Sequence, residues 1–122
     1  MTTILIVEDV FDNFELARKI LTSHGYEVIH AETAESGFQT AFQSRPDLIL
    51  LDLGLPDHDG LTLASWLRAD PSFRTLPIIA FTAWPLETAK QMAESYGCNG
   101  FVSKPVVKVK EFLAQIDSYL IK

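Results

Sequence analysis

The sequence predicts an α/β fold: a doubly wound, parallel five-stranded sheet with helices on both faces, a (βα)5 arrangement in the flavodoxin-like strand order 2-1-3-4-5. Short apolar runs alternate with longer segments of helical period, which is typical of βα units joined by crossovers. The apolar runs are almost continuous in Val, Ile and Leu, which indicates strands that helices cover on both faces. No linker, repeat or low-complexity segment interrupts this pattern, so we expect residues 1–122 to form one domain without an output domain.

Five short apolar runs are the expected strands. They occupy residues 3–7, 26–30, 47–52, 76–81 and 100–103. The third run, DLILLD, stands out because four apolar residues lead directly into an acid, Asp52. A carboxylate at the end of a strand that is buried on both faces needs a chemical reason.

The first two helices are predicted from apolar periodicity and from capping residues. The first has a pair that resembles a capping box, Asp12 and Glu15, and a C-terminal stop at Gly25. The second covers about residues 33–44 behind Thr33 as its N-cap. The apolar stripes of these two helices are Phe14, Ala17, Ile20 and Leu21, and then Ala34, Phe38, Ala41 and Phe42.

The other three helices are predicted in the same way. The third covers about residues 60–69 behind Asp59 as its N-cap, and the fourth begins at Pro85, as a first helical residue, and stops at Gly97. The last covers about residues 107–121. The inward-facing residues expected are Leu63, Ala64 and Leu67 of the third helix, and Val109, Phe112, Leu113, Ile116 and Leu120 of the last.

Composition excludes several classes of function. The formal net charge of −6 argues against non-specific nucleic-acid binding and against an anionic membrane surface, because both need clustered Lys and Arg. The single cysteine, Cys98, excludes an internal disulfide framework and suits a reducing compartment. We find no signal peptide and no apolar run of the ~18 residues that a spanning helix needs. We therefore expect a cytoplasmic protein that contacts neither nucleic acid nor membrane.

Polar residues follow the predicted strands at their carboxyl ends. Glu8 and Asp9 follow the first strand, Asp52 ends the third, Thr82 follows the fourth and Lys104 follows the fifth. In an open α/β sheet, ligands bind in the crevice beyond these strand ends. With the first strand in the centre of the sheet, three carboxylates, a hydroxyl and a lysine converge on one cleft.

These residue types predict phosphoryl chemistry with a divalent cation. Three neighbouring carboxylates repel one another, and Mg2+ relieves that repulsion through oxygen ligands while keeping several waters. The sequence has no His or Cys cluster at the spacing of a zinc site, and neither of the glycine-rich motifs that cradle nucleotide phosphates. A carboxylate can itself be the nucleophile and form an aspartyl-phosphate.

Other polar residues have structural interpretations. Asp57 and Asp59 suit a turn and an N-cap, two positions that aspartate favours. His24, His30 and His58 stand alone in unrelated contexts, and we assign them no chemistry.

Four sequence blocks resemble the response-regulator receiver domain of two-component signalling. They are ILIVED, DLILLDLGLPDHDG, PIIAFTA and GFVSKP, in the same order and at matching spacings over essentially the whole chain. The resemblance implies that Asp52 is the phosphoacceptor. It also implies that Glu8, Asp9, Asp52 and the backbone carbonyl of Gly54 hold Mg2+.

The resemblance implies roles for the later blocks as well. Thr82 would be the hydroxyl that moves toward the phosphoryl group, and Lys104 would contact that group. The Lys104–Pro105 bond would be cis, which is uncommon even before proline. Phe101 would be the switch aromatic, although as a hydrophobic residue it also fits a plain core position.

The chain departs from the usual pattern of the family at two places. Val10 and Phe11 make the rim after the acidic pair more apolar. Gly54 and Trp84 occupy the variable positions that flank the phosphoryl group. Because Gly54 has no side chain to orient water and Trp84 is large enough to shield the site, we expect slow hydrolysis of the aspartyl-phosphate.

The resemblance implies a stand-alone, chemotaxis-regulator-like response regulator, a signalling phosphoacceptor and not a metabolic enzyme, in a monomer or a weak dimer. A histidine kinase or a histidine phosphotransfer protein would donate the phosphoryl group. Output would be a protein contact through the face of helix 4, strand 5 and helix 5; candidate contacts are Lys90, Glu94, Lys108, Lys110 and Glu111. Alternatives remain open: a phosphorelay intermediate or phosphate sink, an interaction module that is never phosphorylated, and a small-molecule phosphatase, for which the sequence offers no lid loop.

Overall fold

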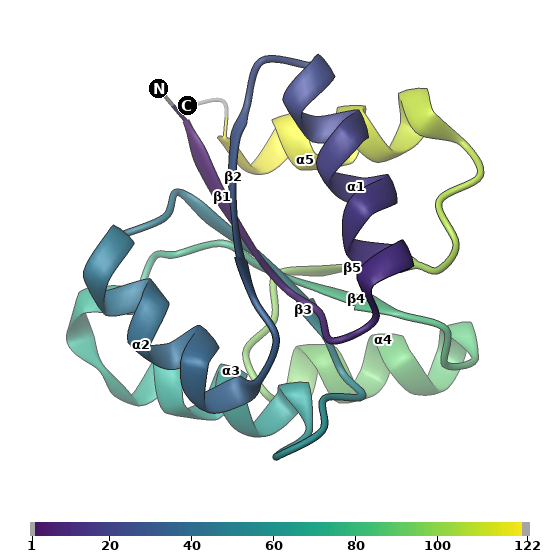
Figure 1. The fold of residues 1–122 in the computed structure, drawn as a ribbon. Helices are drawn as coiled ribbons and strands as arrows, with labels where there is room; N and C mark the ends of the chain where they lie inside the picture. The colour runs from purple at the N-terminus through teal and green to yellow at the C-terminus, as the bar shows by residue number, and fades with distance from the viewer. Residues whose placement is uncertain (1, 121–122) are drawn as a thin grey trace.

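Five parallel strands form one sheet in the order β2-β1-β3-β4-β5 in the computed structural model, which describes residues 2–120 (Figure 1). The strands are β1 Thr3–Val7, β2 Glu27–Ala31, β3 Leu48–Asp52, β4 Ile78–Thr82 and β5 Gly100–Ser103. The predicted fold class and strand order are confirmed. The predicted starts of β2, β3 and β4, at residues 26, 47 and 76, were one or two residues too early. The Tyr26 N–H donates to the Leu21 carbonyl at the end of the preceding helix, and Pro77 has no N–H for the ladder.

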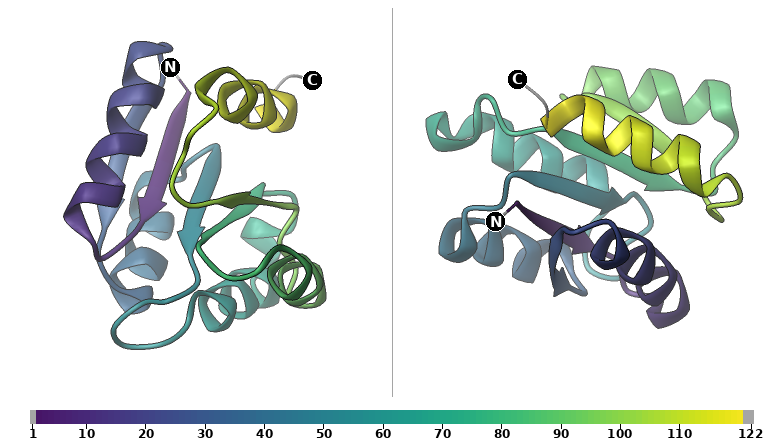
Figure 2. Two further views of the ribbon diagram at one scale, coloured as in Figure 1. Left: turned by 90° about the vertical axis from the view of Figure 1, so that its right-hand side faces the viewer. Right: turned by 90° about the horizontal axis from the view of Figure 1, so that it is seen from above.

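Helices cover both faces of the sheet (Figure 2). They are α1 Phe11–Ser23, α2 Ala34–Ser44, α3 Gly60–Ala69, α4 Leu86–Ser95 and α5 Val109–Leu120, with a short 3-10 turn at Pro71–Phe73. Helices α1 and α5 lie on one face, and α2, α3 and α4 lie on the other. No helix in residues 2–120 is long and apolar enough to cross a membrane.

The two central strands divide their side chains between the two faces. Leu5 and Ile49 belong to the core under α2, α3 and α4, whereas Ile4 and Leu48 belong to the core under α1 and α5. All four are fully buried. Burial of a side chain of this size stabilises the fold by roughly 1.5–3 kcal/mol. Strand β3, buried at every position, therefore holds its terminal Asp52 on a rigid support.

Of the five predicted helix starts, those of α2 and α3 are confirmed and those of α1, α4 and α5 are wrong. Thr33 and Asp59 are the N-caps of α2 and α3, and each side chain accepts a backbone N–H bond. Helix α1 starts one residue before Asp12, with Val10 at the N-cap and no side-chain cap; Glu15 pairs with Arg18 instead. Pro85 is the N-cap of α4 and not its first helical residue.

The helix ends agree better with the prediction. Gly25 and Gly97 both have φ of 95° just beyond α1 and α4, a conformation that glycine adopts without strain. Helix α5 begins at Val109, two residues later than predicted, and Val109 is 43% exposed instead of inward-facing. The predicted last residue of this helix, at position 121, lies outside the described residues.

Candidate functional site

The predicted site residues meet at the carboxyl end of the sheet. Glu8 directly follows β1, Asp52 and Thr82 are the last residues of β3 and β4, and Lys104 directly follows β5. Glu8, Asp52 and Thr82 are the buried polar side chains of the described chain, at 0, 5 and 1% exposure. Asp9 lies beside them and is exposed. Burial of this many polar groups at one point indicates that they stabilise one another or a ligand.

Lys104 joins the two buried acids. Its Nζ lies 2.7 Å from Glu8 Oε1 and 3.1 Å from Asp52 Oδ1, and its side chain is only 10% exposed. The ammonium also lies 5.3 Å from the centroid of the Phe81 ring. The backbone N–H of Lys104 donates to the Thr82 carbonyl, and the peptide bond from Lys104 to Pro105 is cis. One cation thus sits between two carboxylates in a water-poor place.

The charge balance of the pair follows from that arrangement. Burial raises the pKa of Glu8 to about 7, and a hydrogen bond with Asp52 and its negative charge act in the same direction, against Lys104. Burial acts to raise the pKa of Asp52 as well. The hydrogen bonds from Glu8 and the Gly54 N–H, together with the positive charge and hydrogen bond of Lys104, outweigh burial and lower the pKa of Asp52. Glu8 therefore holds its proton more tightly than Asp52, and Asp52 ionises first as the pH rises. Asp52 is the better nucleophile of the two.

The acidic residues have the donor set of a hard cation. Ligand oxygens of Glu8, Asp9 and Asp52 all lie within 4.8 Å of one another. Three carboxylates without nitrogen or sulfur suit Mg2+ better than zinc or copper. The Gly54 N–H donates to Asp52 Oδ1 at 3.1 Å, which aims the Asp52 carboxylate. The residues present therefore fit Mg2+.

The side chains expected to respond to phosphorylation lie on the next two strands. Thr82 Oγ1 accepts the backbone N–H of Trp84 at 3.1 Å. Trp84 and Phe101 are both half-buried and pack against the core under α2, α3 and α4. The Phe101 carbonyl accepts a bond from Gln115 of α5 at 2.8 Å. Strand β5 is thus linked to α5 beside the site.

Two further residues position the site through contacts that the sequence did not indicate. His30 Nε2 bonds the Glu8 carbonyl at 2.8 Å, and the ring stacks on Phe14 with centroids 3.7 Å apart. The Glu8 N–H donates to the Ala31 carbonyl. Strand β2 therefore holds the backbone of the acidic pair from the side, through contacts more than twenty residues apart in sequence.

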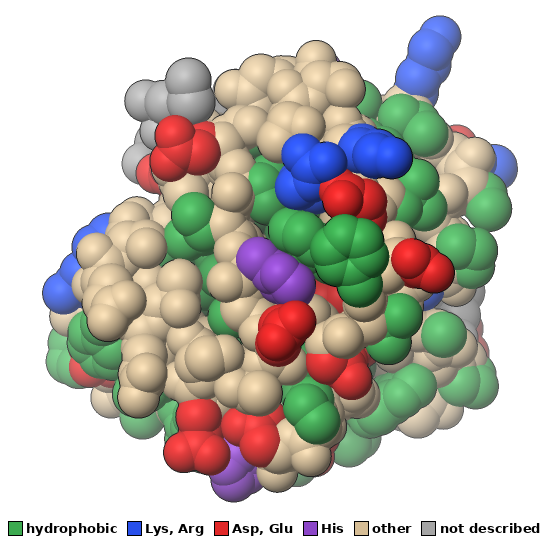
Figure 3. All heavy atoms as spheres, in the orientation of Figure 1, with side chains coloured by type: hydrophobic (Ala, Val, Ile, Leu, Met, Phe, Trp, Pro, Cys, Tyr) green, Lys and Arg blue, Asp and Glu red, His purple; other side chains and the backbone are tan. Residues whose placement is uncertain are grey.

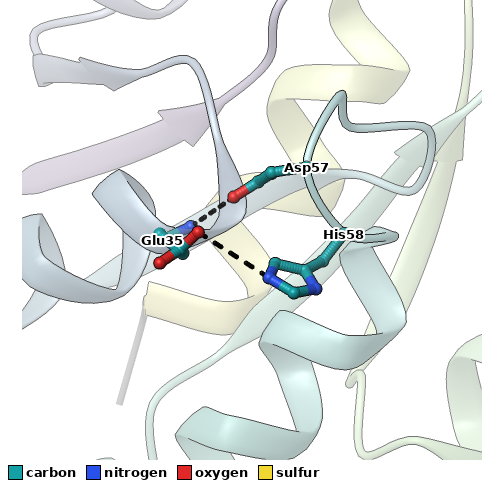
Figure 4. Close-up of side chains that lie close together, drawn as sticks. All are labelled: Glu35, Asp57 and His58. Atoms are coloured by element: carbon teal, nitrogen blue, oxygen red, sulfur yellow. Dashed lines mark hydrogen bonds and ion pairs between the residues drawn. The ribbon is translucent and has the colours of Figure 1, made fainter.

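Asp57 is the second such residue, and its prediction as a turn residue was incomplete. Its carboxylate accepts the N–H groups of Ala34 and Glu35 at 2.8 and 3.0 Å, so it caps α2 from another loop (Figure 4). Partial desolvation acts against these bonds, yet they lower the pKa of Asp57 to about 2. His58 Nε2 lies 3.8 Å from Glu35. Asp57 ties the loop after Asp52 to α2.

The rim of the cleft combines acidic and apolar surface. Acidic side chains gather on the lower half of the face shown in Figure 3, toward the carboxyl ends of β1 and β2. Val10 and Phe11, which follow the acidic pair, are 48 and 60% exposed. The predicted apolar rim is therefore accessible from outside.

Comparison with known proteins agrees with this geometry. Residues 4–117 match the response regulator receiver domain. This chain belongs to the response-regulator receiver family. It is 36% identical over 118 residues to the polar-differentiation response regulator DivK of Brucella anthropi, covering 97% of this chain and 95% of DivK.

Solved receiver structures have the same fold. A response regulator from Chloroflexus aurantiacus superposes with a TM-score of 0.94 at 32% identity, over 99% of this chain and 98% of its own. The receiver domain of a sensor histidine kinase from Pseudomonas aeruginosa superposes with a TM-score of 0.89 at 31% identity, over 98 and 97% of the two chains. That neighbour has a magnesium ion coordinated in its active-site cleft.

Proposed function

We propose that this receiver domain accepts a phosphoryl group on Asp52 from a phosphohistidine donor, in a Mg2+-dependent reaction, and signals through protein contacts that depend on it. One observation carries the proposal: the Asp52 carboxylate lies at the end of a strand that is buried at every position, 3.1 Å from the Lys104 ammonium. The proposed donor in the cell is a histidine kinase or a histidine phosphotransfer protein.

Asp52 acts as the nucleophile of the reaction. One of its carboxylate oxygens attacks phosphorus, the P–N bond of the donor breaks, and its electron pair returns to the imidazole. Lys104, already beside this carboxylate, offers its ammonium to the phosphoryl oxygens as their charge develops. Bound through Glu8, Asp9, Asp52 and the Gly54 carbonyl, Mg2+ would supply charge neutralisation at the same oxygens.

Thr82 and Phe101 convert the new charge into a change of surface. The Thr82 hydroxyl leaves its bond with the Trp84 N–H to donate to the phosphoryl group, and Phe101 repacks behind it. A pocket of about 330 Å³ lies beside Phe101 between α4, β5 and α5, and Lys90 and Glu94 are among its lining residues. Met92 of α4 and Tyr96, the C-cap of that helix, expose apolar surface. This face is the proposed contact for the downstream protein.

Acetyl phosphate tests the phosphoacceptor. With Mg2+, intact mass spectrometry is expected to show one added phosphoryl unit on the native chain and none on Asp52→Asn. Glu94→Gln is the matched control, because it removes an equal charge from an exposed position on α4 outside the cleft, and it should still be phosphorylated. If the native mass changes neither with this donor nor with phosphorylated histidine phosphotransfer proteins, the chain is an interaction module that is never phosphorylated.

The same experiment tests the proposed slow hydrolysis. After donor and Mg2+ are removed, the phosphorylated mass should decay several-fold faster in Trp84→Ala than in the native chain, because water then reaches the aspartyl-phosphate. Trp84→Leu, which keeps apolar volume against the core, should decay at an intermediate rate. Equal lifetimes in all three would show that Trp84 does not shield the site.

A further inference from the structure

A pocket of about 460 Å³ opens between α2 and α3, outside the strand-end cleft. Its lining residues are Glu35, Phe38 and Gln39 from α2, and Trp66 and Ala69 from α3. The spacings of three and four residues place these side chains on the facing surfaces of the two helices. No Lys or Arg is among them. The proposed phosphoryl chemistry uses none of these residues.

The walls of the pocket are aromatic. Phe38 and Trp66 meet edge to face with ring centroids 5.8 Å apart, and His58 lies edge-on to Trp66 at 4.9 Å. Phe38 and Trp66 are each half-buried, so part of each ring borders the open space. Indole and phenyl rings attract cations at their faces, with a strength of roughly 0.5–2 kcal/mol.

The rings of Trp66, Phe38, Phe42 and Phe73 form an aromatic row, and a guanidinium lies at the end opposite to Trp66. Phe38 packs edge to face on Phe42, and Phe42 packs in the same way on Phe73. The guanidinium carbon of Arg45 lies 5.6 Å from the Phe42 centroid and 5.5 Å from the Phe73 centroid. Arg45 therefore shows that this aromatic row can bind a guanidinium.

A carboxylate stands at the open end of the row. The Glu35 side chain is 69% exposed, and its neighbour in Figure 4 is His58, with Nε2 at 3.8 Å. Asp57, the other acid of this corner, already accepts two N–H groups of α2. Glu35 is therefore the acid available to a cation in the pocket.

We propose that the pocket between α2 and α3 is a docking site for an arginine side chain presented by another protein. A planar guanidinium can lie against Trp66 and Phe38 while it donates to the Glu35 carboxylate; an ammonium cannot make both contacts as well. A second copy of this chain is a poor occupant, because two chains of net charge −6 repel each other. The partner therefore presents a basic segment.

An arginine analogue tests the pocket directly. N-acetyl-arginine amide is added to the 15N-labelled protein, with N-acetyl-citrulline amide as the neutral compound of the same shape. The Trp66 indole N–H signal should shift saturably with arginine, at the millimolar affinity of a small fragment, and the shift should weaken with salt. Trp84, the other tryptophan, is the internal reference and should not move.

Variants separate the two contacts. Glu35→Gln should weaken binding several-fold, Trp66→Leu should abolish the saturable shift of the Phe38 ring signals, and Trp66→Phe should retain part of it. Glu94→Gln on α4 is the matched charge control and should bind like the native chain. Equal shifts with citrulline, or native affinity in Glu35→Gln, would overturn the proposal. A Trp66 signal that moves with protein concentration alone would assign the pocket to a second copy instead.

Discussion

Glu8 and Asp52 carry the main electrostatic conflict of the molecule. Both are buried, and a single ammonium, Lys104, lies within 3.1 Å of each. One cation compensates one carboxylate, so the second acid is more stable when it keeps its proton. Glu8 has the higher pKa of the two, so Asp52 is the acid that becomes an anion first.

Glu8 should make the stability of the metal-free protein depend on pH. Burial raises its folded pKa to about 7, from 4.5 in a free side chain. The contribution of protonated Glu8 to the free energy of unfolding is complete below pH 4.5. It is lost as the pH rises through 7, because Glu8 ionises at a lower pH in the unfolded chain than in the folded one. The loss is up to about 3 kcal/mol. Urea unfolding with EDTA should show that the native chain loses free energy of unfolding between pH 5 and pH 8. Glu8→Gln should lose less over the same range.

Glu8→Gln keeps the shape of the side chain and cannot ionise. Glu94→Gln, at an exposed position on α4, is the control for removing one acid and should follow the native curve. If Glu8→Gln loses as much stability as the native chain between the two pH values, the proton does not reside on Glu8.

At the scale of elements, the start of α3 is built around a glycine. A Cβ on Gly60 would lie 2.1 Å from the backbone oxygen of Asp52 and 2.9 Å from the Leu53 Cα, and the Gly60 N–H donates to the Leu53 carbonyl. Helix α3 thus touches the backbone of the proposed phosphoacceptor. A side chain here cannot be accommodated by a rotamer change, because backbone atoms occupy the space.

Gly60→Ala should therefore destabilise the protein by about 3 kcal/mol or more, the upper range for overpacking. Gly54→Ala is the matched control in the same loop. Its added Cβ would meet only Asp52 Oδ1, at 3.9 Å, so its effect should stay within about 0.5 kcal/mol, as at an open surface position. Urea midpoints of the two variants against the native chain provide the measurement. A Gly60→Ala variant as stable as Gly54→Ala would show that α3 can move away from β3 freely.

Helix boundaries show which parts of an element can be predicted from sequence. Thr33 and Asp59 were predicted because an N-cap bonds an N–H only three residues away. Asp12 and Glu15 have the same local pattern, yet Val10 is the N-cap of α1, and its N–H donates to Glu8 Oε2 at 3.3 Å. The second cap of α2, Asp57, lies more than twenty residues away, so no local spacing indicates it.

At the scale of the whole molecule, topology predicted the site better than any single residue did. Asp52, Thr82 and Lys104 converge because parallel strands end at the same edge, and the apolar runs indicated those ends. The bond from His30 to Glu8 and the aromatic row beside α3 depend on packing between elements. Such packing carries no periodic signal in the sequence.

The proposed metal links the site to the stability of the entire fold. Three carboxylates lie within one cluster in a chain of net charge −6, and unfolding separates them. A cation that binds the folded cluster and not the unfolded chain must raise the free energy of unfolding. Asp9 is the exposed member of the cluster, so it contributes to the cation site without contributing much to the core.

Mg2+ should therefore raise the melting temperature of the native chain. At a concentration ten times its dissociation constant, the gain is about 1.4 kcal/mol, or roughly 3–6 °C for a domain of this size. Asp9→Asn should melt close to the native temperature without Mg2+ and should lose most of the gain, which differential scanning calorimetry can follow. KCl at equal ionic strength controls for general screening of the net charge. An equal rise in melting temperature with KCl, or the full Mg2+ rise in Asp9→Asn, would place the effect outside the acidic cluster. The reason is that only a cation held by these carboxylates depends on Asp9.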